Sequence, residues 1–230
     1  MDIIKYLIDL FIHLDKHLIE IVGHYGTLTY AILFFVIFAE TGFVFTPFLP
    51  GDSLLFAAGT LAALPVIVSA GGTITQYSVL NVHYLFLLLA AAAILGNSAN
   101  YFIGHFIGER IFHENSRILK KEYLNRTHQF YEKHGGITVV ITRFVPIIRT
   151  IAPFVAGVGS MTFTRFSMYN IAGGILWVAL FIYGGFFFGN IPFVRNNFSV
   201  VTLAIILISV LPMVIEFIRR KYFTNYLRGK

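Results

Sequence analysis

The chain has 230 residues, of which 57% are hydrophobic and only 12% are charged, and its net charge is +6 at pH 7. A soluble domain has about 25% charged residues, so this composition excludes an ordinary soluble enzyme and predicts one integral membrane domain over residues 1–230. The chain has no cysteine, which excludes disulfides and thiolate metal sites.

The N-terminal segment has charged and histidine side chains at spacings of three and four residues between positions 2 and 20. The remaining positions are mostly isoleucine, leucine and phenylalanine, so the pattern is that of an amphipathic helix. Such a helix is more typical of the membrane interface than of a span. We expect residues 1–25 to form this helix.

The first half, residues 28–108, begins with a broken apolar segment. Residues 28–45 and 53–68 are apolar and flank Pro47, Pro50 and Gly51. An arm of about 16 helical residues is about 24 Å long, shorter than a hydrocarbon core of about 30 Å. The break therefore predicts a re-entrant helical hairpin, with two ordinary spans joined by a tight turn as the alternative.

A full span is expected at residues 82–108, since no charged residue occurs between Asp52 and Glu109. Asn97 and Asn100 lie inside this span. Buried asparagines hydrogen-bond between helices or line a cavity, and the sequence leaves both roles open.

The second half, residues 135–218, repeats this order. A broken segment at 137–163 contains Pro146, Pro153 and Gly157, and spans are expected at 167–189 and at about 199–218. Together with Pro47, Pro50 and Gly51, these three residues are expected to shape the two breaks.

Lysine and arginine are concentrated in a loop at 109–134 and a tail at 219–230. Basic clusters beside spans are typical of the cytoplasmic side, and neither stretch has the basic and aromatic pattern of a nucleic-acid site. We therefore expect an all-α fold with two opposed re-entrant hairpins in an inverted repeat, three full spans and a cytoplasmic C-terminus.

Two acids and two arginines interrupt the broken segments. Glu40 and Asp52 flank the first break, and Arg143 and Arg149 flank the second around Pro146. Each charge costs about 2.5–3.5 kcal/mol near the bilayer centre, so such residues pair, face water or bind a ligand.

Both pairs of charges allow a structural and a functional interpretation. A carboxylate removed from water can bind and release protons near neutral pH, but Glu40 and Asp52 also suit ion pairs with the arginines, or a helix cap. The planar guanidinium of arginine fits phosphate oxygens. Arg143 and Arg149 therefore predict an anionic head group as ligand, or serve only as partners of the acids.

Other chemistry finds little support in the sequence. The eight histidines form no metal-ligand spacing, and no nucleophile motif of a lipase or phosphatase occurs. We expect no enzyme activity, no cofactor and no metal.

Three stretches resemble the DedA family of bacterial inner-membrane proteins, also called SNARE-associated or VTT-domain proteins: FLPGDSLL at 48–55, HQFYEKHGG at 128–136 and RFVPIIRTIAPFVAG at 143–157. The resemblance implies that Glu40 and Asp52 are the family's membrane-embedded acids and that Arg143 and Arg149 are its essential arginines. Many members have aspartate where this chain has Asn97, which removes a titrating role at that position.

The resemblance implies a proton-motive-force-linked flippase that returns undecaprenyl phosphate across the inner membrane for cell-envelope synthesis. Arg143 and Arg149 would hold the phosphate, and Glu40 and Asp52 would couple its movement to protons. A general phospholipid scramblase and a proton-coupled small-cation antiporter are the alternatives. The expected partners are an anionic lipid and protons, and a homodimer is left open.

Overall fold

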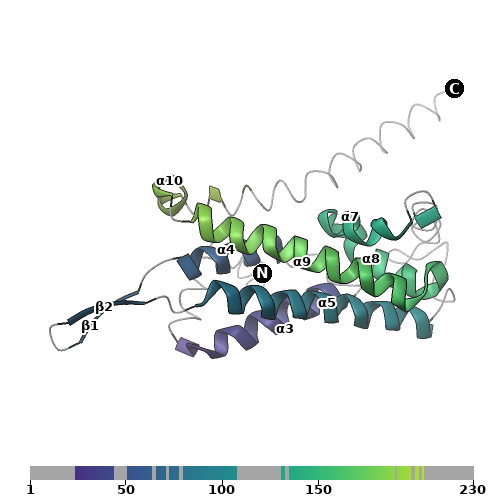
Figure 1. Ribbon diagram of the computed structural model, residues 1–230, viewed down its shortest axis with the longest axis horizontal. Coiled ribbons are helices and arrows are strands. Elements are labelled where there is room, and N and C mark those ends of the chain that lie inside the picture. The colour runs from purple at the N-terminus through teal and green to yellow at the C-terminus, as the bar shows by residue number, and fades with distance from the viewer. Residues whose placement is uncertain are drawn as a thin grey trace, which may run out of the picture.

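The computed structural model describes residues 24–43, 51–63, 66–70, 73–77, 80–107, 131–132, 135–189, 191–197, 200–201 and 204. Two long helices, α5 (Val82–Ile107) and α9 (Phe163–Phe188), lie side by side along its long axis (Figure 1). Each has 26 residues and is long and apolar enough to cross a membrane. They confirm the helices expected at 82–108 and 167–189.

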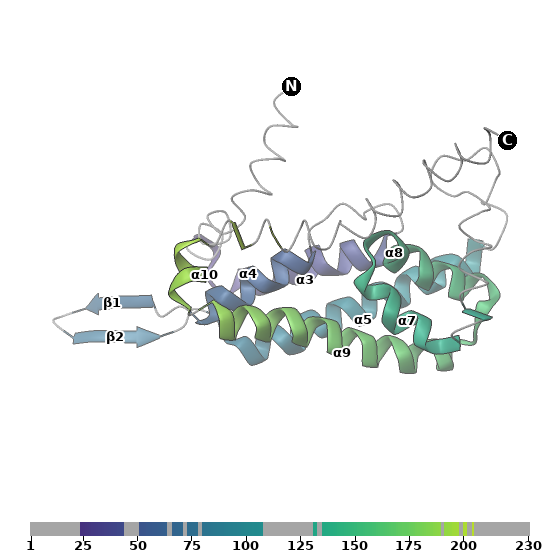
Figure 2. The ribbon, with the colours of Figure 1, turned by 90° about the horizontal axis from the view of Figure 1, so that it is seen from above.

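The first broken segment forms a pair of short helices, α3 (Leu28–Gly42) and α4 (Gly51–Ala63). Helix α3 packs on α5, whereas α4 packs on α9. The second broken segment, residues 135–160, forms the second helix pair and lies toward the opposite end of the two long helices (Figure 2). The side chains buried among α3, α4, α5 and α9 form the larger hydrophobic core.

The second broken segment is more irregular. It runs through η2 (Gly135–Ile137), α7 (Thr138–Ile141), η3 (Thr142–Phe144), α8 (Pro146–Val155) and the π-helical segment η4 (Ala156–Ser160). The break falls at Val145, which is extended with φ −120° and ψ 105°, as expected for a residue that precedes proline. Pro146 then begins α8, because the first helical position needs no N–H partner.

Pro153 does not form a second break, contrary to prediction, and lies inside α8. Proline removes only one hydrogen bond from the helix, and side chains from other segments hold the neighbouring turns. Asn100 donates to the Thr150 carbonyl at 2.8 Å, and the Tyr131 hydroxyl donates to the Ala152 carbonyl at 2.9 Å. Burial raises the pKa of Tyr131 above its ordinary value, so the hydroxyl remains a donor.

The two helix pairs contact the long helices in the same reciprocal way. In the first pair, α3 packs on α5 of its own half, and α4 packs on α9 of the other half. In the second pair, the first arm (η2, α7 and η3) packs on α9 of its own half, and the second arm (α8 and η4) packs on α5 of the other half. Four glycines lie where the second arms cross: Gly59 and Gly185 between α4 and α9, and Gly104 and Gly157 between α5 and the segment α8–η4. A Cβ atom on any of them would lie between 1.9 and 2.1 Å from a facing carbonyl oxygen. Glycine is therefore required for this close approach.

A hairpin of two antiparallel strands, β1 (Val66–Ala70) and β2 (Thr73–Tyr77), projects beyond the helices next to the start of α5 (Figure 1). Its register pairs Val66 with Tyr77 and Ala70 with Thr73. The prediction of an all-α fold holds for the helical body and missed this hairpin. Valine, isoleucine and threonine dominate the two strands, and such β-branched residues favour strands.

A short helix, α10 (Pro192–Asn196), follows α9. The predicted amphipathic helix at 1–25, the charged loop at 109–134, the third span and the basic tail lie almost wholly outside the described residues. Pro47 and Pro50 also lie outside them, so their expected role in the first break stays a prediction.

Candidate functional site

The acids of the first break meet one arginine of the second. Arg149 forms ion pairs with both carboxylates, through Nη2 to Glu40 and through Nη1 to Asp52 Oδ1 at 3.1 Å. The Glu40 side chain is fully buried, and those of Arg149 and Asp52 are only 8% and 13% exposed. Attraction between charges is strong where water is scarce, so this triad joins the two helix pairs.

Gly51 completes the surroundings of Glu40. Its N–H donates to Glu40 Oε1 at 3.2 Å, and a Cβ atom at Gly51 would lie 1.9 Å from Glu40 Oε2. Helix α4 begins at Gly51, so Asp52 lies in its first turn, where the helix dipole favours a negative charge. Gly51 therefore binds Glu40 directly, beyond its expected role in shaping the break.

Trp177 of α9 contacts two members of the triad, Asp52 and Arg149. Its indole N–H donates to Asp52 Oδ1 at 2.9 Å, and its ring centroid lies 5.6 Å from the guanidinium carbon of Arg149. The side chain is 1% exposed. Trp177 thus contacts both an acid and an arginine of the predicted site, and it is the only tryptophan of the chain.

Arg143 has a different environment. It is 4% exposed, and among the described residues no carboxylate lies within ion-pair distance of it. Its Nη2 instead donates to the side-chain oxygen of Asn170 at 2.5 Å and to the Asn170 carbonyl at 3.3 Å. The interpretation of both arginines as partners of the acids therefore applies to Arg149 and not to Arg143.

Both arginines line one small cavity. The other lining residues are Thr41, Asn97 and Trp177, and the cavity has a volume of about 10 Å³, close to what one water molecule needs. Two guanidinium groups and two neutral polar side chains face the same space. The arrangement can bind an anion through charge-assisted hydrogen bonds.

The two asparagines of α5 take the two roles that the sequence left open. Asn100 is fully buried and donates to the carbonyls of Thr41 and Thr150, so it bridges the two helix pairs. Asn97 lines the cavity. One turn along α5 therefore carries a structural and a cavity-lining asparagine.

Sequence reasoning missed Thr41, Asn170 and Trp177. A polar side chain inside a charge-free apolar stretch is the signal that pointed to Asn97 and Asn100 in the stretch 53–108. It applies equally to Asn170 in the stretch 166–194. Pro153 and Gly157 of the predicted break lie in helical segments instead, and Gly157 serves helix packing.

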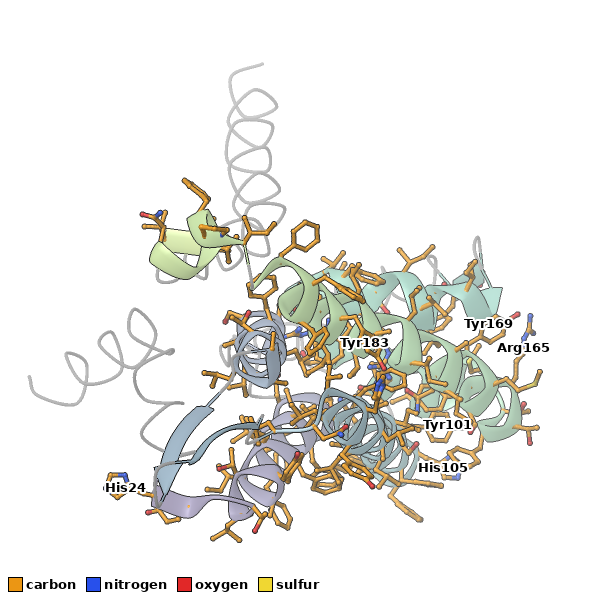
Figure 3. All side chains as sticks on the ribbon, turned by 60° about the vertical axis from the view of Figure 1, so that its left-hand side comes forward. His24, Tyr101, His105, Arg165, Tyr169 and Tyr183 are labelled. Carbon is orange, nitrogen blue, oxygen red and sulfur yellow. The ribbon has the colours of Figure 1, made fainter. Side chains whose placement is uncertain are left out.

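The histidine near the end of α5 does not take part in the site. The rings of His105 and Tyr101 are stacked at a centroid distance of 6.3 Å, at the opposite end of the molecule from His24 (Figure 3). Within the described residues, no cluster of side chains is suited to hold a metal ion.

Comparison with known proteins places this chain in a family. Residues 49–187 match the VTT domain. The chain is 52% identical to the protein named Protein DedA of Escherichia coli strain K12, over 222 residues and 96% of each chain. It is 38% identical to the uncharacterized membrane protein Rv0364 of Mycobacterium tuberculosis strain H37Rv over 195 residues, or 84% of this chain and 81% of the relative.

A third relative is the inner membrane protein YqjA of Escherichia coli strain K12, 32% identical over 164 residues, which cover 71% of this chain and 69% of the relative. No solved structure is significantly similar to the chain. The relatives named as membrane proteins agree with the hydropathy of α5 and α9. The match to the VTT domain and the identity to DedA show that this chain is a membrane protein of the DedA family.

Proposed function

We propose that this protein is a proton-linked transporter that moves a polyprenyl phosphate, such as undecaprenyl phosphate, across the bacterial cytoplasmic membrane. The observation that carries the proposal is Arg143, a buried cation that faces a cavity and is held by an amide instead of a carboxylate. A charge without a counter-ion is costly away from water, and binding an anion would offset that cost.

The helix arrangement supports alternating access to this site. We propose that the two helix pairs re-enter the membrane from opposite faces, with three full spans and a cytoplasmic C-terminus. The reciprocal glycine contacts support an inverted repeat. Non-helical backbone such as Val145 is tolerated at membrane depth when protein encloses it, and the buried neighbours Arg143 and Arg149 meet that condition.

The two arginines would act in sequence. Arg143 is ready to receive a phosphate oxygen, whereas Arg149 is engaged by Glu40 and Asp52. Protonation of either acid removes one negative partner and frees guanidinium donors of Arg149 for the ligand. Proton binding and phosphate binding would then favour each other, since both relieve the same charge balance.

The cavity also constrains the transport cycle. A space of about 10 Å³ is too small for a phosphate group, so the walls must separate to admit one. Those walls come from α3, α5, η3, α8 and α9. Relative movement of the two helix pairs would open the cavity while the triad breaks and forms again.

The test is transport by the purified protein in liposomes, with and without an imposed pH gradient. A fluorescent polyprenyl phosphate and a fluorescent phosphatidylglycerol would be compared by quenching the label in the outer leaflet. Arg143→Gln and Arg149→Lys should each lower polyprenyl phosphate transport at least tenfold. The control is Arg165→Gln, the same loss of charge at an exposed residue near the start of α9 (Figure 3), which should leave transport unchanged.

Each outcome separates one function from another. Gradient-sensitive transport of the polyprenyl phosphate that needs both arginines would support the proposal. Equal transport of both lipids without any effect of the gradient would point to a scramblase. Normal transport by Arg149→Lys would contradict direct phosphate binding by that residue, because lysine lacks the planar fork of arginine.

A further inference from the structure

Asn170 is the residue that accepts the hydrogen bonds of Arg143 beside the cavity. It lies on α9, is fully buried, and does not itself line the cavity. Its side-chain oxygen accepts from Arg143, while its side-chain nitrogen donates to the Ile94 carbonyl at 3.0 Å and to Ser98 Oγ at 3.2 Å. Because both ends of the amide have partners, its orientation is fixed.

These contacts connect three segments at one point. Arg143 belongs to η3, Asn170 to α9, and Ile94 and Ser98 to α5. Ser98 is itself fixed, since its hydroxyl donates to the Ile94 carbonyl at 2.8 Å. The two long helices therefore hold the guanidinium group through one residue, by the side-chain oxygen and the main-chain carbonyl of Asn170.

The choice of an amide has an electrostatic consequence. Asn170 accepts a hydrogen bond from Arg143 without adding a negative charge, whereas Arg149 is neutralised by two carboxylates. Only Nη2 of Arg143 bonds to Asn170, and Nε makes no hydrogen bond among the described residues. Donors and charge of Arg143 thus remain for a ligand.

We infer that Asn170 is a positioning residue that holds Arg143 at the cavity wall while leaving its positive charge available to a phosphate group. The inference deepens the proposed function and rests on it. It assigns to Asn170 no contact with the ligand. Its effect on binding must therefore pass entirely through Arg143.

The experiment uses the full chain in detergent and follows the fluorescence of Trp177, which contacts Arg149 and lines the cavity. Farnesyl phosphate is the ligand, and farnesol, which lacks the phosphate, corrects for partition into micelles. The variants are Asn170→Asp, Arg143→Gln and the double variant. The isosteric carboxylate would pair with Arg143, so Asn170→Asp should weaken farnesyl phosphate binding at least tenfold while farnesol is unaffected.

The double variant distinguishes positioning from general damage. If Asn170 acts through Arg143, the aspartate should cause less than a twofold further loss once Arg143 is glutamine. A full additional tenfold loss in that background would overturn the inference. If Asn170→Asp does not fold, Asn170→Ser replaces it in the double-mutant cycle with Arg143→Gln, because the serine hydroxyl does not reach far enough to replace the amide contact with Arg143.

A second readout keeps this inference separate from the proposed function. Melting temperatures of the wild type, Arg143→Gln, Asn170→Ser and their double variant test the contact without any ligand, and the two single effects should not add. Wild-type protein that prefers farnesyl phosphate no more than farnesol would reject the proposed function. Normal phosphate preference with a tenfold loss in Arg143→Gln and none in Asn170→Asp would reject the inference alone.

Discussion

The two helix pairs share a scaffold but not a chemistry. In each pair the second arm crosses a long helix with one glycine on each side of the contact. Gly59 of α4 faces the carbonyl of Ile182, three residues before Gly185 of α9. In the same way, Gly157 of η4 faces the carbonyl of Tyr101, three residues before Gly104 of α5. The break of the first pair carries Glu40 and Asp52, and that of the second carries Arg143 and Arg149. Close packing is thus repeated while charge is inverted.

The charges of the two pairs do not simply cancel. Arg149 forms ion pairs with both acids, whereas Arg143 donates a hydrogen bond to the side-chain amide of Asn170 on α9. Two acids and two arginines sum to zero, yet the ion pairs leave the positive charge of Arg143 without a carboxylate among the described residues. Under the proposed function, the shared packing would let the halves move against each other, and the unequal pairing would select the ligand.

The largest effect should separate the two arginines by stability. Arg149→Gln leaves Glu40 and Asp52 facing each other without a cation, and breaking a buried ion pair in this way costs about 3–5 kcal/mol. Arg143→Gln removes only hydrogen bonds to Asn170, and leaving such a buried acceptor unpaired costs about 1–3 kcal/mol. Thermal unfolding in detergent should therefore rank Arg149→Gln well below Arg143→Gln.

A compensating change provides the control for this ranking. Replacing Glu40, Asp52 and Arg149 by Gln, Asn and Gln removes every charge of the triad, so stability should recover relative to Arg149→Gln. Transport should stay lost in the triple variant, as in Arg149→Gln and Arg143→Gln. Equal melting temperatures for the two single variants would show that the two arginines are paired alike.

The second effect tests whether the glycine crossings are equivalent. Gly185→Ala and Gly157→Ala each place a Cβ atom about 2 Å from a backbone oxygen, so the helices must separate at a cost of about 1–3 kcal/mol. Gly184 is the matched control, since a Cβ atom there meets nothing within 4 Å. Unfolding midpoints should fall for the first two and stay or rise for Gly184→Ala. A loss in only one crossing would contradict the shared scaffold.

Much of the helical body was accessible from the sequence because its signals are local. The long apolar runs predicted the helices α5 and α9. The break at Pro146 was also predicted, because the residue before a proline favours an extended conformation. Pro153 was misjudged because what holds its neighbouring turns is tertiary, namely Asn100 and Tyr131 from distant segments. The β-hairpin was missed because Val66 and Ile67, the first residues of β1, continue the apolar run of α4 and were assigned to the helical arm at 53–68.

The site was predictable in its charges and not in their pairing. Charged residues inside apolar segments are conspicuous, so Glu40, Asp52, Arg143 and Arg149 could be named from the sequence. Which acid meets which arginine depends on how the two pairs dock, and that is set by glycine contacts far along the chain. Asn170 carries no charge, and its importance arises only from its contact with Arg143.

The smallest effect sharpens the comparison at one matched position of each pair. Thr41 and Thr142 stand beside the charged residues of the first arms, and each hydroxyl donates to the carbonyl four residues earlier, at 2.8 and 2.7 Å. Both are buried. Valine has nearly the same shape and lacks the hydroxyl, and those carbonyls can keep backbone partners, so each substitution should change stability by about 1 kcal/mol or less.

Transport should nevertheless distinguish the two threonines, because only Thr41 lines the cavity. Thr41→Val removes a polar group from the wall that a phosphate would meet. To donate to the phosphate, the hydroxyl must turn away from the Ile37 carbonyl, so the net gain is that of an ordinary hydrogen bond, about 0.5–1.5 kcal/mol, and a loss of about two- to tenfold in polyprenyl phosphate transport is expected. Thr142→Val should transport normally. Equal transport by the two valine variants would show that the hydroxyl of Thr41 serves only its own helix, and the binding site would then be limited to the arginines and Asn97.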